Sequence, residues 1–209
     1  MTVKVDLGGV GRGGEWLTVN WDDGTVRLSP DIVADISAAG RQLELYFEPN
    51  SIDELRCVHT LEHLAYKDWP ETLKYWLGFL KPGGKLLIVV PDMGQLIEDY
   101  WVGDIDFNVF ASVAWHPTFR ENKGPGEMHR WGWVDRTLFQ DLERAGYVDV
   151  GSGTDADYQS HWLYDYEEFQ FTGAVGRYWV PNLRMVGRKP SSPGPFPREV
   201  EGEKAEEVV

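Results

Sequence analysis

Residues 80–92 read Leu80-Lys81-Pro82-Gly83-Gly84-Lys85-Leu86-Leu87-Ile88-Val89-Val90-Pro91-Asp92. Proline cannot continue a helix and glycine tolerates a positive φ, so residues 81–84 are predicted to form a tight turn. The run from Leu86 to Val90 shows no polar alternation, which is typical of a strand buried on both faces of a parallel sheet. Asp92 follows that strand at its carboxyl end, where open α/β sheets bind their ligands.

Similar patterns before and after this segment predict an alternation of strands and helices. Apolar strand patterns are found at residues 3–7, 16–21, 32–34, 55–59, 85–90, 147–150 and 183–187. Asp68 and Glu71 have the spacing of a capping box, and they precede a helical face formed by Trp69, Leu73 and Trp76. The alternation predicts an α/β fold with a Rossmann-like, doubly wound sheet of seven strands. The sheet is expected to be mostly parallel with an antiparallel final strand.

The strand patterns predict one domain over residues 1–189, followed by a tail. Two insertions are expected within the domain, at about residues 93–133 and 155–182, because long connections in compact domains usually serve as lids or binding loops. Residues 190–209 hold four prolines and five glutamates with little apolar content, so a disordered acidic tail is expected.

Composition and charge restrict the partners. The chain has 209 residues and a formal net charge of −14, and it shows no basic patch, so a nucleic-acid partner is not expected. No apolar run approaches the ~20 residues needed to span a bilayer. Cys57 is the only cysteine, and the chain enters a strand pattern at Val3 without a signal peptide. We therefore expect a protein of the reducing cytoplasm that does not bind membranes.

A glycine-rich turn follows the first predicted strand and includes Gly8, Gly9 and Gly11. Such a turn lets the backbone approach a cofactor closely. Asp22, at the end of the second strand, is placed to hold a ribose diol, although a solvated turn aspartate fits equally. Asp35 ends the third strand and can contact an adenine amino group or cap a helix.

Several motifs then follow one another in a definite order. They are Glu15-Trp16-Leu17-Thr18-Val19-Asn20-Trp21-Asp22, Asp35-Ile36, Asp53-Glu54, Leu61-Glu62-His63-Leu64, Leu80-Lys81-Pro82-Gly83-Gly84, Val90-Pro91-Asp92, His129-Arg130-Trp131-Gly132-Trp133 and Ala145-Gly146-Tyr147. This order resembles class I S-adenosylmethionine (SAM)-dependent methyltransferases, and is closest to a small bacterial and phage branch often found beside glycosyltransferases. The resemblance spans about residues 3–189.

The resemblance implies a SAM cofactor and a methyl transfer reaction. The acceptor is expected to be an oxygen of a sugar or of another small polar molecule, a free compound or a glycan. The cofactor-binding residues that the resemblance implies are Gly8, Gly9, Gly11, Asn20, Asp22, Asp35, Ile36, His59 and Thr60. Glu62 and His63 are interpreted as the first turn after a strand, partly structural and partly lining the cofactor.

His129 is the leading catalytic candidate because methyl transfer to oxygen often needs a base for the acceptor proton. Histidine suits that role near neutral pH. Asp92 and His116 are weaker candidates. The alternative for His129 is a structural hydrogen bond that orients the next helix. Trp131 and Trp133 belong either to the core or to a pocket wall.

The glycine turn departs from the spacing of the resembled family. That family would place glycines at positions 8, 10 and 12, whereas this chain has Gly8, Val10 and Arg12. The departure leaves open a second hypothesis, a binding or structural protein with a methyltransferase fold that has lost the cofactor.

A third hypothesis rests on His59-Thr60-Leu61-Glu62-His63, which is a literal His-x-x-Glu-His zinc-hydrolase motif. That motif requires both histidines on one helix. Since His59 ends an apolar strand, it is not expected to share a helical face with His63. The sequence analysis therefore predicts no metal ligands.

Overall fold

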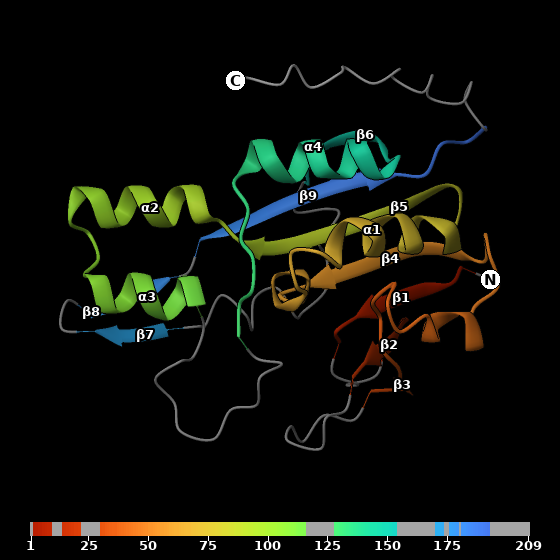
Figure 1. The fold of residues 1–209 in the computed structure, drawn as a ribbon, viewed down its shortest axis with the longest axis horizontal. Coiled ribbons are helices and arrows are strands. Elements are labelled where there is room, and N and C mark those ends of the chain that lie inside the picture. Colours follow the sequence, from red (N-terminus) through yellow and green to blue (C-terminus); the bar gives the residue numbers. More distant parts are fainter. Residues whose placement is uncertain are drawn as a thin grey trace, which may run out of the picture.

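The structure, a computed structural model, describes residues 2–9, 14–21, 30–115, 128–153, 170–173, 176–179 and 181–192 (Figure 1). Three predicted site residues, Gly11, Asp22 and His116, lie outside these ranges. In the described part of the chain, no helix is both long enough and apolar enough to cross a bilayer.

The main sheet has seven strands, as predicted. They are β1 (Lys4–Leu7), β2 (Trp16–Asn20), β3 (Ile32–Val33), β4 (Ile52–Val58), β5 (Leu80–Pro91), β6 (Val148–Ser152) and β9 (Asn182–Arg188). Their order is β3-β2-β1-β4-β5-β9-β6. Strands β1 to β5 pair in parallel, while β9 runs antiparallel to both β5 and β6. The predicted antiparallel final strand is therefore confirmed.

The strand order defines where a ligand can enter. From the centre of the sheet, β2 and β3 extend to one side of β1, whereas β4 and β5 extend to the other side. The strand order therefore reverses between β1 and β4, which makes this place the topological switch point of the sheet. Open α/β sheets bind ligands outside the carboxyl ends of the strands at such a switch point.

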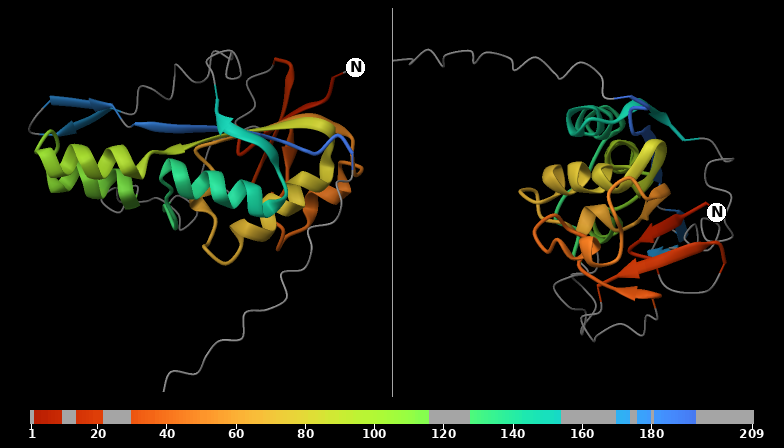
Figure 2. Two further views of the ribbon diagram at one scale, coloured as in Figure 1. Left: turned by 90° about the horizontal axis from the view of Figure 1, so that it is seen from above. Right: turned by 90° about the vertical axis from the view of Figure 1, so that its right-hand side faces the viewer.

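Most of the described helices lie on one side of the main sheet, but the two that directly follow β5 lie beyond its carboxyl end (Figures 1 and 2). The described helices are the short 3-10 helices η1 (Gln42–Leu45) and η2 (Leu61–His63) and the α-helices α1 (Trp69–Phe79), α2 (Met93–Val102), α3 (Phe107–Trp115) and α4 (Asp135–Ala145). Helices α1 and α4 pack on the sheet through fully buried side chains that include Leu73, Trp76, Leu138 and Leu142. This packing is the main core of the protein.

The beginning of α1 differs from its prediction. Asp68 occupies the N-cap position, but its side chain makes no capping hydrogen bond. Its backbone carbonyl instead accepts from the amide and the hydroxyl of Thr72, at 3.0 and 2.8 Å. Glu71 does not close a capping box, because its carboxylate pairs with Lys74 at 2.8 Å on the exposed face.

The Pro-Gly-Gly segment also differs from the simple turn that was predicted. Strand β5 begins already at Leu80, which pairs with Ile52, and the next pair is Lys85 with Glu54. Four residues of β5 thus stand opposite one of β4, which makes an extended bulge. Gly83 has a φ of 78° there. The bulge is held by Lys189, whose carbonyl accepts from the Gly83 amide and whose amide donates to the Gly84 carbonyl, both at 2.9 Å.

The two predicted insertions contain regular structure. The first insertion holds helices α2 and α3. A separate two-stranded antiparallel sheet, β7 (Gln170–Gly173) with β8 (Gly176–Trp179), lies within the second insertion. Helices α2 and α3 form their own small core around Leu96, Ile105 and Val109.

Candidate functional site

The glycine turn after β1 lies directly against the end of β4. Gly8 has a φ of 87°, and a Cβ built on it would lie 1.9 Å from the Thr60 hydroxyl oxygen. Any side chain at this position would therefore collide with Thr60. The Gly8 amide donates to the Val19 carbonyl at 2.7 Å, which anchors the turn to β2. Two predicted cofactor-binding positions, Gly8 and Thr60, thus meet at the switch point between β1 and β4.

Asn20 fixes the shape of this turn. Its side-chain amide donates to the carbonyl of Gly8 at 2.9 Å and to the carbonyl of Gly9 at 3.3 Å. Gly9 itself approaches the Asp6 carboxylate so closely that a Cβ would lie 2.7 Å from it. The turn is therefore braced from β2 and packed against β1, with the Asn20 amide acting on the protein backbone.

Asp35 and Ile36 lie after β3, and both have partners within the fold. One Asp35 oxygen accepts from the Ser37 amide at 2.8 Å; this bond stabilises a turn and caps no helix, because the next helix, η1, begins at Gln42. Ile36 is buried, and its carbonyl accepts from the indole of Trp76 at 2.7 Å. Contact of either residue with a cofactor stays a prediction.

Asp92 caps helix α2. Its Oδ1 accepts from the amides of Gly94 and Gln95, at 2.9 and 3.2 Å. A carboxylate at an N-cap satisfies amides that have no partner inside the helix. Helix capping is by itself enough to explain an aspartate at the carboxyl end of β5. A catalytic role for Asp92 stays a prediction.

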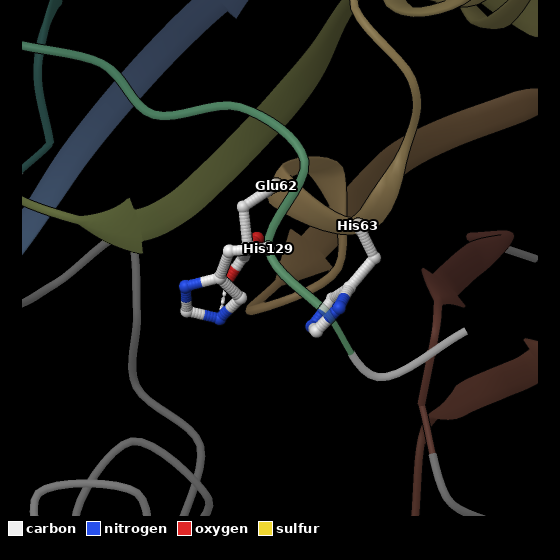
Figure 3. Close-up of side chains that lie close together, drawn as sticks. All are labelled: Glu62, His63 and His129. Carbon is white, nitrogen blue, oxygen red and sulfur yellow. Dashed lines mark ion pairs between the residues drawn. The ribbon is translucent and has the colours of Figure 1, made fainter. Parts of the chain in front are cut away.

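A cluster of one carboxylate and three imidazoles lies beside the switch point (Figure 3 shows Glu62, His63 and His129). Glu62, in η2, is 1% exposed. Its Oε1 lies 3.3 Å from Nδ1 of His59 and 3.9 Å from Nε2 of His129. The rings of His63 and His129 meet edge to face with centroids 5.0 Å apart.

Backbone hydrogen bonds hold the cluster together. The amides of Arg130 and Trp131 donate to the Glu62 carbonyl, at 2.8 and 3.2 Å, so the segment after His129 lies against η2. His59 has a φ of 48°, and its amide donates to Val89 of β5 at 2.9 Å. His59 therefore lies outside η2, as the sequence analysis expected. The helical context that a His-x-x-Glu-His hydrolase requires is absent from this described segment.

Burial and charge act in opposite directions on the cluster. Burial opposes ionisation of Glu62, but the surrounding histidines, His59 foremost, hold its pKa below the ordinary value. Burial lowers the pKa of His129 to about 4, although the Glu62 carboxylate opposes this shift. At neutral pH, Glu62 is thus ionised and the His129 ring is neutral, with a lone pair to offer.

Sequence reasoning did not assign Glu62 its central place. The signal was present, because a glutamate directly after an apolar strand is flanked by Leu61 and by histidines at positions 59 and 63. The third histidine at position 129 is remote in sequence. Its approach to Glu62 depends on how the segment before α4 crosses η2.

An aromatic pocket lies between α1 and α4, beside the segment that follows His129. Its volume is about 600 Å³, and its lining includes Tyr66, Trp69, Trp131 and Lys74. The rings of Tyr66 and Trp131 lie 4.4 Å apart, and Trp131 is 40% exposed. Trp133 is 1% exposed and belongs to the core. Both tryptophans line the pocket, and Trp133 also belongs to the core.

No protein-family model and no curated protein matches the chain. Solved structures do match it. A SAM-dependent methyltransferase from Archaeoglobus fulgidus superposes with a TM-score of 0.51 at 13% identity, over 90% of this chain and 86% of that one. The SAM-dependent methyltransferase SibL gives a TM-score of 0.51 at 16% identity, with 90% of this chain spanning 50% of SibL.

These likenesses, together with the strand order, establish the fold. The chain has the Rossmann-like fold of class I SAM-dependent methyltransferases. At such identities the comparison says nothing about substrate, so the activity has to be argued from the site.

Proposed function

We propose that the protein is a SAM-dependent methyltransferase that acts on an oxygen of a sugar or of another small polar acceptor. The observation that carries this proposal is the close contact of Gly8 with Thr60 at the switch point, beside the Glu62 and His129 side chains. A backbone turn at this place is what a nucleoside-containing cofactor needs for close approach.

The residues present fit SAM. Gly8 and Gly9 have no side chain, and a Cβ on them would collide with Thr60 and with the Asp6 carboxylate, so only glycine allows this close packing of the turn. Gly8, Gly9, Thr60 and His59 would line the cofactor, and Asn20 would keep the turn in shape. Bound SAM supplies an electrophilic methyl group on its sulfonium sulfur.

His129 and Glu62 would manage the acceptor proton. Methyl transfer from bound SAM to a hydroxyl oxygen would release S-adenosylhomocysteine and the hydroxyl proton, and that proton would need an acceptor. Nε2 of the neutral His129 ring can take that proton, and the imidazolium formed would lie 3.9 Å from the Glu62 carboxylate. A carboxylate beside the ring stabilises the charge that develops on it. The aromatic pocket near Trp131 offers flat apolar faces that suit a sugar ring.

Calorimetric titration with S-adenosylhomocysteine tests the cofactor proposal. We expect binding by the wild type and loss of binding in Gly8→Ala. Gly78→Ala is the matched control because a Cβ there meets nothing within 4 Å. If the folded wild type does not bind S-adenosylhomocysteine, the cofactor-free alternative is favoured and the proposal fails.

A further inference from the structure

Glu62, His63 and His129 bring a carboxylate and two imidazoles to one point beyond β4 (Figure 3). One ligand atom from each residue lies within 4.8 Å of the other two. Two imidazoles and a carboxylate form a donor set that zinc uses in catalytic sites, where a fourth position stays open. We propose that these three residues bind one divalent metal ion of the zinc class.

The state of Glu62 supports this proposal. In the described part of the chain, neither of its buried oxygens accepts a hydrogen bond of good geometry, although His59 and His129 lie at 3.3 and 3.9 Å. A buried carboxylate without such partners is costly, and buried charges are usually paired or bound to a metal. A dication between Glu62 and the two imidazoles would remove that cost.

The surroundings of the histidines also match a metal site. Histidine ligands usually donate their second ring N–H to a carbonyl or a carboxylate, which orients the ring. Nδ1 of His63 lies 3.3 Å from the Met128 carbonyl. The Val113 backbone hydrogen-bonds the His129 ring. Each proposed histidine ligand thus has a backbone partner that can fix its orientation.

The change of geometry that metal binding requires is small. Tetrahedral ligands of zinc lie about 3.4 Å from one another, so a pair that is up to 4.8 Å apart has to close by at most about 1.4 Å. His63 is only half-buried, so its side chain has room for a small shift. Glu62 and the segment after His129 are already joined by the backbone hydrogen bonds of Arg130 and Trp131.

A metal in this place gives the acceptor a binding position, and this step rests on the proposed function. The acceptor hydroxyl would occupy the open fourth position, where the metal lowers its pKa and its proton passes to water. The resulting oxygen anion would form the bond to the methyl carbon as the carbon–sulfur bond breaks. His129 would then serve as a metal ligand, and direct proton transfer to its ring would be replaced.

Cobalt titration of the full, untagged chain after chelator treatment tests the site, because Co²⁺ reports its ligands by visible absorption. We expect one Co²⁺ per chain and displacement by one equivalent of Zn²⁺. Glu62→Gln and His63→Ala should each weaken Co²⁺ binding by about 100-fold or more. Mutation of residues that only hydrogen-bond the metal ligands already lowers metal affinity by about 10–100-fold. Glu71→Gln, which removes an exposed carboxylate paired with Lys74, should bind as the wild type does.

The metal proposal is overturned if the wild type binds no Co²⁺, or if folded His63→Ala binds it as tightly as the wild type. Titration of the same samples with S-adenosylhomocysteine separates the two proposals. Binding of S-adenosylhomocysteine without Co²⁺ would reject the metal and leave methyl transfer standing. Binding of Co²⁺ without S-adenosylhomocysteine would reject the proposed function and leave the metal site standing.

Discussion

Replacement of Gly8 by alanine is expected to destabilise the fold as well as the cofactor site. The left-handed backbone at Gly8, with its φ of 87°, costs an L-residue about 1–2 kcal/mol. The new Cβ would also lie 1.9 Å from Thr60 Oγ1 and 2.7 Å from Thr60 Cβ. Overpacking of this kind costs roughly 1–3 kcal/mol. The two contributions together predict a loss of about 2–5 kcal/mol in the free energy of unfolding.

A double-mutant cycle separates the two contributions. Thr60→Gly removes the colliding side chain, so Gly8→Ala in that background should cost only the backbone term of about 1–2 kcal/mol. Urea denaturation of the four proteins measures each free energy, and thermal unfolding should shift by about 2–4 °C per kcal/mol for a chain of this size. Gly78→Ala, at an exposed position in the last turn of α1, should be neutral or stabilising by up to about 1 kcal/mol.

The steric argument would be refuted by equal costs of Gly8→Ala in the presence and absence of the Thr60 side chain. In that case the turn would have enough freedom to move away from β4. The close contact between β1 and β4 would then have no consequence for the cofactor site.

Three further predictions concern charged groups. Arg56→Ala should cost about 3–5 kcal/mol in urea denaturation, because it leaves the buried Asp6 carboxylate without its 2.6 Å partner; a cost under 1 kcal/mol would contradict this. Asp92→Asn should keep α2 capped and retain activity, whereas Asp92→Ala should lose about 1 kcal/mol in the free energy of unfolding. If Asp92→Asn is stable but inactive, Asp92 has a catalytic role. Lys81 and then the Val3 amide, through their hydrogen bonds, hold the pKa of Asp53 below its usual range. The stabilisation by Asp53 is therefore complete at neutral pH and is lost as the pH falls through that lowered pKa. Asp53→Asn should therefore lower the melting temperature at pH 7 and match the wild type in strong acid, and a constant difference across pH would contradict it.

The sheet could be predicted because its strands carry their own signal. The run from Leu86 to Val90 is wholly buried, and its lack of polar alternation predicts this burial. Local rules were less reliable where a residue had two partners available. Asp68 and Glu71 had capping-box spacing, but the Asp68 side chain makes no capping hydrogen bond and the Glu71 carboxylate pairs with Lys74. The bulge at residues 81–84 depends on Lys189, which is remote in sequence and cannot be inferred from a turn pattern.

The site shows the same division between local and remote information. The glycine turn and the polar residues at strand ends could be predicted, because parallel strands bring their carboxyl ends to one edge. The cluster could not, since the contact between Glu62 and His129 follows from hydrogen bonds between η2 and the segment before α4. Likewise, only the fold distinguishes buried Trp133 from exposed Trp131.

The burial of Glu62 links the two proposals. A carboxylate that is 1% exposed and ionised needs a positive charge nearby, and three imidazoles surround Glu62. An imidazole can supply this positive charge by accepting a proton during the reaction. Alternatively, the imidazoles and the carboxylate can bind one metal ion together. The first use requires a proton to reach His129 from the acceptor, and the second requires His63 to contribute a ligand atom. Because only the second involves His63, that half-buried residue is the position at which the two chemistries can be told apart.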